Sequence, residues 1–126
     1  MIEEVLTSVL KNNAGIAAVT PRVYPGKVPQ DAPLPLIYYV KVSGSPDHSV
    51  KGPTDLAQAR FQIEAWATTY LAAKQLAALI ETALDGQKHT LGSDYIRSVV
   101  KQGERDFYEP ELSCHRVSCD YSIWYR

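Results

Sequence analysis

Residues 57–65, Ala-Gln-Ala-Arg-Phe-Gln-Ile-Glu-Ala, alternate small or apolar residues with polar ones. Successive side chains of a β-strand point to opposite faces of a sheet, so this alternation predicts a strand with one buried face and one solvated face. Phe61 and Ile63 point inward in this interpretation, whereas Arg60, Gln62 and Glu64 point outward. No other part of the chain has so clear a strand pattern, and the elements on either side of it decide the fold class.

Two helices are predicted, one before and one after this strand. Residues 2–11 place apolar side chains three and four positions apart, which is the spacing of an amphipathic helix. After the strand, Thr68 or Thr69 can cap a helix rich in alanine and leucine that ends at Asp85-Gly86. We expect this second helix to pack across the sheet.

Three further strands are predicted, over residues 36–42, 95–101 and 112–125. Both faces of the strand over residues 36–42 are apolar, so it is either central in the sheet or has one face that a partner covers. An acidic turn is expected between the last two strands. It contains Glu104, Asp106, Glu109 and Glu111.

The predicted order of elements is α-β-β-α-β-β. We therefore expect residues 1–126 to form a single α+β domain, in which a mostly antiparallel, twisted sheet of about four strands has both helices packed on one face.

A proline-rich segment, residues 20–35, precedes the first predicted strand. It holds five prolines, which exclude both a helix and a central strand and predict an extended, stiff arm. The arm is either a rigid surface loop or a contact with a neighbouring subunit. Stiffness suits a contact, because a rigid segment loses less conformational entropy when it binds.

The charge balance argues against tight binding of nucleic acid. The chain has 126 residues, with 13 Lys and Arg against 14 Asp and Glu, and neither half carries the basic excess typical of proteins that neutralise phosphates. We also expect no membrane contact, because no stretch is as long and apolar as a membrane span and the acidic beginning is unlike a signal peptide. The protein is thus expected in a cytoplasm.

No group of residues predicts catalysis, a cofactor or a metal site. Cys114 and Cys119 would lie about 16 Å apart on opposite faces of one strand, too far for a shared ion or a disulfide. His115 and Cys119 share a face but would be about 13 Å apart. Asp47, His48 and Ser49 contain the residue types of a hydrolase triad, but sequence neighbours rarely converge in space, so a polar turn is expected there. We therefore predict that the protein is not an enzyme.

Three segments resemble the tail completion proteins of long-tailed bacteriophages. They are residues 22–25 (Arg-Val-Tyr-Pro), 29–39 (Pro-Gln-Asp-Ala-Pro-Leu-Pro-Leu-Ile-Tyr-Tyr) and 60–67 (Arg-Phe-Gln-Ile-Glu-Ala-Trp-Ala). The resemblance extends to about Leu84 and weakens afterwards. It implies a fold like that of phage tail terminators and a homo-oligomeric ring, commonly a hexamer, at the head-proximal end of the tail of a phage or prophage virion.

The resemblance also implies partners. The ring would end polymerisation of the tail tube protein and contact the head-tail connector protein, with DNA passing through without specific binding, after assembly in the host bacterial cytoplasm. We expect the arm to make the subunit contacts, and two loops to contact the tube or the connector. The subunit-contact residues are Arg22, Tyr24, Pro25, Pro29, Pro33, Leu34 and Pro35. The loop residues are Asp47, His48, Lys51, Glu104, Arg105 and Asp106.

Other functions remain open. A head-closure or neck protein, or a minor tail protein, would have the same size and would equally lack catalytic groups. A small ligand-binding or enzymatic α+β domain could use a pocket between helix and sheet, with His115 or Asp47 and His48.

Overall fold

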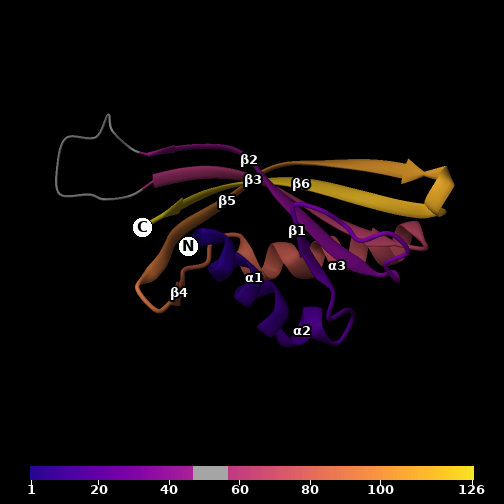
Figure 1. Ribbon diagram of the computed structural model, residues 1–126, viewed down its shortest axis with the longest axis horizontal. Helices are drawn as coiled ribbons and strands as arrows, with labels where there is room; N and C mark the ends of the chain where they lie inside the picture. Colours follow the sequence, from indigo (N-terminus) through magenta and orange to yellow (C-terminus); the bar gives the residue numbers. More distant parts are fainter. Residues whose placement is uncertain (47–56) are drawn as a thin grey trace.

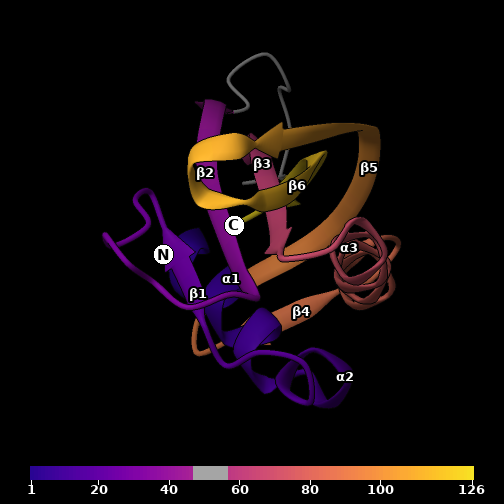
Figure 2. The ribbon, with the colours of Figure 1, turned by 90° about the vertical axis from the view of Figure 1, so that its right-hand side faces the viewer.

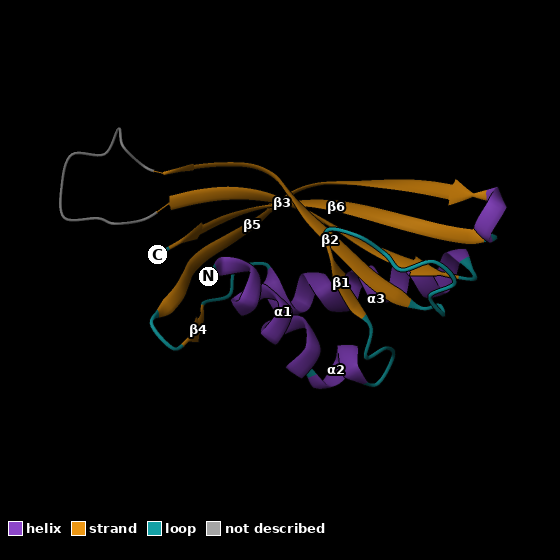
Figure 3. Cartoon of the chain, in the orientation of Figure 1, coloured by secondary structure: helices purple, strands orange, loops and turns teal. Residues whose placement is uncertain are grey.

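A computed structural model of the protein describes residues 1–46 and 57–126. Within these residues a twisted six-stranded sheet, in the order β1-β2-β3-β6-β5-β4, runs through the molecule, and the helices lie on one side of it (Figures 1 and 3). Figure 2 shows α3 end-on beneath the sheet. The strands are β1 (Val23–Pro25), β2 (Leu36–Pro46), β3 (Ala57–Ala67), β4 (His89–Leu91), β5 (Asp94–Glu109) and β6 (Cys114–Tyr125).

The predicted helices are both present, with a short additional one. They are α1 (Ile2–Asn12), α2 (Ala14–Ala17) and α3 (Tyr70–Leu84), and a 3₁₀ turn, η1, spans Pro110–Leu112. The Thr69 side chain caps α3 by accepting a hydrogen bond from the Ala72 amide at 3.1 Å. Asn13 caps α2 in the same way, through the Ile16 amide at 3.0 Å. At the turn between α1 and α2, the Asn13 side chain therefore satisfies one of the backbone amides at the start of α2.

The hydrophobic core lies between the helices and one face of the sheet. The inward side chains predicted for residues 57–65 are in it, with Phe61 fully buried and its ring 5.9 Å from that of Tyr39. Tyr39 also links the sheet to α1, because its hydroxyl contacts Thr7 Oγ1 at 2.5 Å and donates to the Glu3 carbonyl at 2.8 Å. Core side chains of α3 are Ala73, Leu76, Ala77, Ile80, Ala83 and Leu84.

The predicted α+β order with about four antiparallel strands is wrong. The sheet has six strands in the described residues and is mixed, because β1 pairs with β2 in parallel while the other pairs are antiparallel. β1 lies inside the proline-rich arm, and β4 follows α3. Each is three residues long, too short to produce a periodic pattern, and each forms only because a longer strand offers it backbone partners.

The expected acidic turn around Glu104 and Asp106 is also wrong, because both residues lie inside β5. This strand continues from the predicted end at Lys101 to Glu109, and only η1 separates it from β6. Acidic residues are unfavourable in strands when they are unpaired. Here Lys74 and Lys101 neutralise them, as described below, and this cross-element pairing has no signature in the local sequence.

The strand with two apolar faces is β2. Ile37 and Tyr39 point into the core, and Leu36 on the other face is fully buried as well. Val42 is 48% exposed. One half of β2 is therefore covered on both faces, and the other half is open on one.

Candidate interaction surface

The sheet face that points away from the helices, which we call the outer face, is mainly polar, and most of its residues are exposed or half-buried. Four neighbouring strands contribute to it in antiparallel register, so that residues from β2, β3, β6 and β5 form rows across the sheet. The outer-face residues are Tyr38, Val40, Ser43, Gln58, Arg60, Gln62, Glu64, Trp66, Ser98, Val100, Arg105, Phe107, Arg116, Ser118, Asp120, Ser122 and Trp124.

A fully buried carboxylate, Glu64, organises one end of the outer face. Its Oε1 accepts hydrogen bonds from Arg116 Nη2 at 2.8 Å, Arg116 Nε at 3.0 Å and Trp66 Nε1 at 2.8 Å. Its Oε2 accepts from Gln62 Nε2 at 2.5 Å. A buried carboxylate is costly unless it is paired and hydrogen-bonded, and both conditions are met here.

The Arg116 guanidinium lies between two aromatic rings. Its Cζ is 4.9 Å from the centre of the Trp66 ring and 5.8 Å from that of Phe107. Cation–π contacts of this kind hold the guanidinium in place. Tyr38 extends the cluster, with its ring 6.1 Å from that of Trp66. We name Glu64, Trp66, Phe107 and Arg116 the outer-face cluster.

The proline-rich arm is folded against the sheet beside this cluster. Arg22 Nε donates to the carbonyls of Pro33 at 3.0 Å and Pro35 at 3.2 Å, and Thr20 Oγ1 donates to the Pro35 carbonyl at 2.8 Å. These bonds tie the two ends of the arm together. The arm, Trp66 and Leu112 enclose a cavity of about 320 Å³ with a mainly apolar lining.

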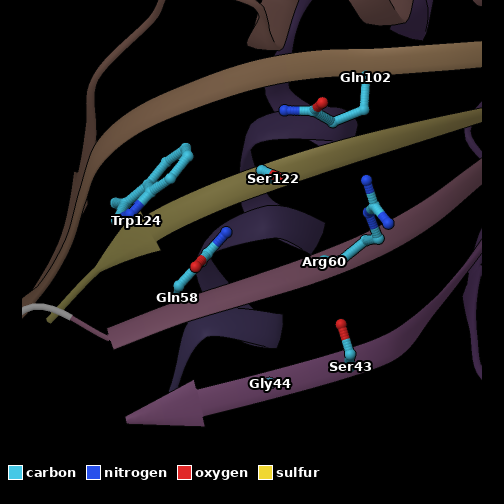
Figure 4. A pocket seen from close by; sticks show the side chains of 7 residues that line it. All are labelled: Ser43, Gly44, Gln58, Arg60, Gln102, Ser122 and Trp124. Atoms are coloured by element: carbon cyan, nitrogen blue, oxygen red, sulfur yellow. The ribbon is translucent and has the colours of Figure 1, made fainter. Parts of the chain in front are cut away.

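The opposite end of the outer face holds an open polar cavity of about 410 Å³ (Figure 4). Side chains from four strands line it: Ser43 of β2, Gln58 and Arg60 of β3, Gln102 of β5, and Ser122 and Trp124 of β6. Amides, hydroxyls, a guanidinium and an indole can hydrogen-bond to a partner's backbone or polar side chains. None of these groups is a nucleophile paired with a base.

Glu104 and Asp106 belong to an ion-pair network on the helix side of β5. Lys74 of α3 contacts Glu104 and lies 3.0 Å from Asp106, while Lys101 lies 2.7 Å from both Glu81 and Glu104. Tyr70 donates to Asp106 at 2.8 Å. Hydrogen bonds from Lys101 and Lys74 lower the pKa of Glu104 to about 2, and that from Tyr70, with a further one from Lys74, lowers the pKa of Asp106.

This network predicts acid sensitivity. A carboxylate whose pKa is lower in the folded protein stabilises it above its ordinary pKa, 4.5 for Glu104, and this stabilisation is lost as the pH falls towards about 2. Glu104→Gln should therefore flatten the loss of stability between pH 5 and pH 2, which urea titrations at several pH values measure. Glu111→Gln, an exposed residue in η1, is the matched control. Equal slopes for Glu104→Gln and the unchanged protein would contradict the network.

The two cysteines are buried free thiols, and β6 is continuous from Cys114, so they point to opposite faces as predicted. Burial raises the pKa of both thiols, that of Cys119 to about 12. His115 stacks against Tyr70 and Tyr108, with ring centres 5.9 and 4.7 Å away. Among the described residues, no group of three or more His, Cys, Asp or Glu side chains could hold a metal ion.

The predicted contact residues fall into three groups. The arm residues Arg22, Tyr24, Pro25, Pro29, Pro33, Leu34 and Pro35 lie in one segment, where Pro25, Pro29 and Pro33 are exposed and the other four are half-buried. Asp47, His48 and Lys51 lie outside the described residues. Glu104, Arg105 and Asp106 are in strand β5 instead of a loop, and Arg105 lies 3.5 Å from Asp120.

Sequence reasoning missed the outer-face cluster. The alternation over residues 57–65 does place Glu64 on the face opposite Phe61, and that is the available signal. Nothing in the local sequence shows that β6 brings Arg116 beside it, because strand register is set by the whole sheet.

No helix in residues 1–46 or 57–126 is long and apolar enough to cross a lipid bilayer.

The model of one protein family, described as Tail completion protein gp17, matches residues 4–126. No curated protein matches the chain. Among solved structures, a chain of the virion of the native gene transfer agent (GTA) particle is similar, with a TM-score of 0.75 and 17% identity over 98% of this chain and 93% of that one. A second structure, whose name states no activity, has a TM-score of 0.60 and 12% identity over 98% and 95% of the two chains.

Proposed function

The chain belongs to the Tail completion protein gp17 family, the structural phage tail proteins, and from this premise we propose that it forms a ring at the head-proximal end of a phage-like tail. There it would end polymerisation of the tail tube and join the tail to the head connector. The match over residues 4–126 is the observation that carries the proposal. It spans all but the first three residues of the chain.

The surface chemistry supports a structural role. Among the residues that the structure describes, the outer face carries three arginines, two acids, two glutamines and several hydroxyls, so it shows no large excess of one charge. A surface of this kind neither binds nor repels a DNA backbone strongly, because phosphate binding requires an excess of lysine and arginine. We propose that DNA passes through the ring without specific binding and that six copies form it.

The arm is the proposed site of subunit contacts. Exposed Pro25, Pro29 and Pro33 present a rigid surface, since Arg22 and Thr20 fix both ends of the arm on its own subunit. A rigid surface loses little entropy on binding. The arm therefore meets the requirement for a repeated contact without a folding step.

The arm is tested with the double variant Pro33→Gly, Leu34→Ser. We expect it to lose assembly on the tail while the isolated protein keeps its far-ultraviolet circular dichroism spectrum. The matched control is Lys88→Gly, Gln87→Ser, two exposed residues after α3. Unchanged assembly of the arm variant would exclude the arm from the subunit contact.

The function is tested by deleting the reading frame and examining the particles by electron microscopy. Unattached heads together with tails of uncontrolled length are the expected result. Tails of normal length without heads would shift the role to head closure or the neck. Intact particles would contradict both roles and favour a ligand-binding domain instead.

A further inference from the structure

Two strands of the sheet have edges that are only half covered, and they lie on opposite sides of it. β1 pairs with β2 only at Ile37–Tyr39, so from Val40 to Pro46 no described strand lies beside β2 on that side. β4 pairs with β5 only as far as Ile96. The turn after α3 then covers β5 at residues 99–101, through the Gly86 amide on the Val99 carbonyl and Asp85 on the Lys101 amide.

Beyond this turn, no described backbone group pairs with residues 102–109 of β5 on the side of the strand away from β6. Phe107 and Tyr108 in this stretch are 47% and 54% exposed, on opposite faces of the strand. A long strand edge that carries exposed aromatic residues invites pairing with another chain. Edges of stable monomers are normally short, charged on both faces or covered.

We propose that β5 of one copy pairs with β2 of the next copy, so that the sheet continues from subunit to subunit. This inference rests on the proposed ring and adds the contact that closes it. Because β2, β3, β6 and β5 alternate in direction, β5 runs opposite to β2. Copies arranged head to tail around a rotation axis would then join these two different edges as an antiparallel pair, which repeats until the ring closes.

The side chains favour one register. Residues opposite each other in an antiparallel pair share a face, and Val40 and Phe107 both lie on the outer face. If they are paired, Lys41 lies opposite Asp106 on the helix side, and Ser43 lies opposite Arg105 once the irregularity of β2 after Lys41 is followed. The pairing ends at Val40, because β1 already covers β2 at Ile37–Tyr39, so the end of β5 after Phe107 has to bend away from β1 of the neighbouring copy. This register places an apolar pair beside a pair of opposite charges, each of which also has a partner in its own subunit, Glu3 for Lys41 and Lys74 for Asp106.

The geometry is compatible with a closed ring. Phe107 lies in the same row of its own sheet as Leu36, four residues from Val40 along β2. Each copy would therefore be displaced by about 14 Å along the strands. Across four strands, a width of about 19 Å, this displacement corresponds to a strand slant of about 35°. Strands in closed barrels slant by a similar angle relative to the axis.

The test uses pairs of cysteines in purified particles. Ser43→Cys combined with Arg105→Cys should give disulfide-linked multimers on a non-reducing gel, in most of the protein after mild oxidation. Within one subunit β3 and β6 lie between the two strands, so the two positions are at least about 14 Å apart and cannot bridge internally. Native Cys114 and Cys119 are buried, and the protein without added cysteines shows how much cross-linking these two thiols cause by themselves.

Two further pairs guard against a shifted register. Ser43→Cys is combined with Gly103→Cys and with Phe107→Cys, and Ser43→Cys with Lys88→Cys is the matched control, because Lys88 lies outside both edges. Multimers from an edge pair, and none from the control, support the contact.

Failure of the contact and failure of the function look different. Particles that contain the protein, have tails of normal length and give no multimers from any of the three edge pairs would overturn the contact and leave the proposed function standing. Absence of the protein from the particles would overturn both.

Discussion

Arg116→Met is expected to lower the free energy of unfolding by about 3 kcal/mol, because it leaves the Glu64 carboxylate buried without its cation. Glu64 has no solvent-accessible surface to recover hydration, and its remaining donors are Gln62 and Trp66. Methionine keeps much of the volume of the arginine stem, so the change tests charge more than packing. Urea denaturation followed by circular dichroism measures the loss.

A control variant and a rescue variant distinguish loss of the Glu64–Arg116 ion pair from a general loss of stability. Arg105→Met, on the same face, breaks a pair at 3.5 Å in which the arginine is 54% exposed, and it should cost well under 1 kcal/mol. Glu64→Gln added to Arg116→Met should restore part of the lost stability, because a neutral amide no longer needs a cation. Equal losses for Arg116→Met and Arg105→Met would show that Glu64 is not held as the distances indicate.

Leu76→Ala is expected to cost about 3 kcal/mol. Leu76 is fully buried between α3 and the sheet, and truncation removes apolar contacts and leaves a cavity that rigid neighbours fill only in part. Alanine is a good helix former, so the substitution does not lower the helix propensity of α3. Thermal or urea denaturation gives the difference directly.

The same helix provides a matched control. Leu71, the second residue of α3, is 66% exposed, and Leu71→Ala should change stability by no more than about 0.5 kcal/mol. The two substitutions are chemically identical and differ only in burial. Similar effects at both positions would contradict the packing of α3 on the sheet.

The corrected position of Glu104 and Asp106 changes which residues can contact a partner. Lys74 and Lys101 already neutralise them, so they do not form a free acidic loop. Their neighbours on β5 carry exposed aromatic side chains instead. For this part of the chain, the proposed contact is therefore the edge of β5, along which both apolar and charged side chains meet the neighbouring copy.

Periodic patterns predicted the longer elements well. The amphipathic spacing at residues 2–11 corresponds to α1, the alternation at residues 57–65 to β3, and the capping threonines before the alanine-rich stretch to α3. Each of these is a local property, since a helix face or a strand face repeats within a few residues. The resemblance carried by the proline-rich and aromatic segments likewise depends on residues near one another, and these residues are enough to indicate the family.

Contacts between distant segments were beyond the reach of these patterns. β1 and β4 exist because β2 and β5 lie beside them. β5 extends through Glu104 and Asp106 because Lys74 of α3 lies against it, and Glu64 is buried because β6 brings Arg116 to it. These features depend on strand order and register, which whole-sheet packing sets.

The sequence by itself thus determined the family, the main helices and strands, and the buried faces of α1 and β3, because burial of an apolar face follows from local periodicity. Only the tertiary structure decided the strand count, the outer-face cluster and the two half-covered edges. Those features arise from energies shared between residues far apart in the chain, such as backbone pairing and neutralisation of a buried charge, and such energies exist only once the sheet has formed.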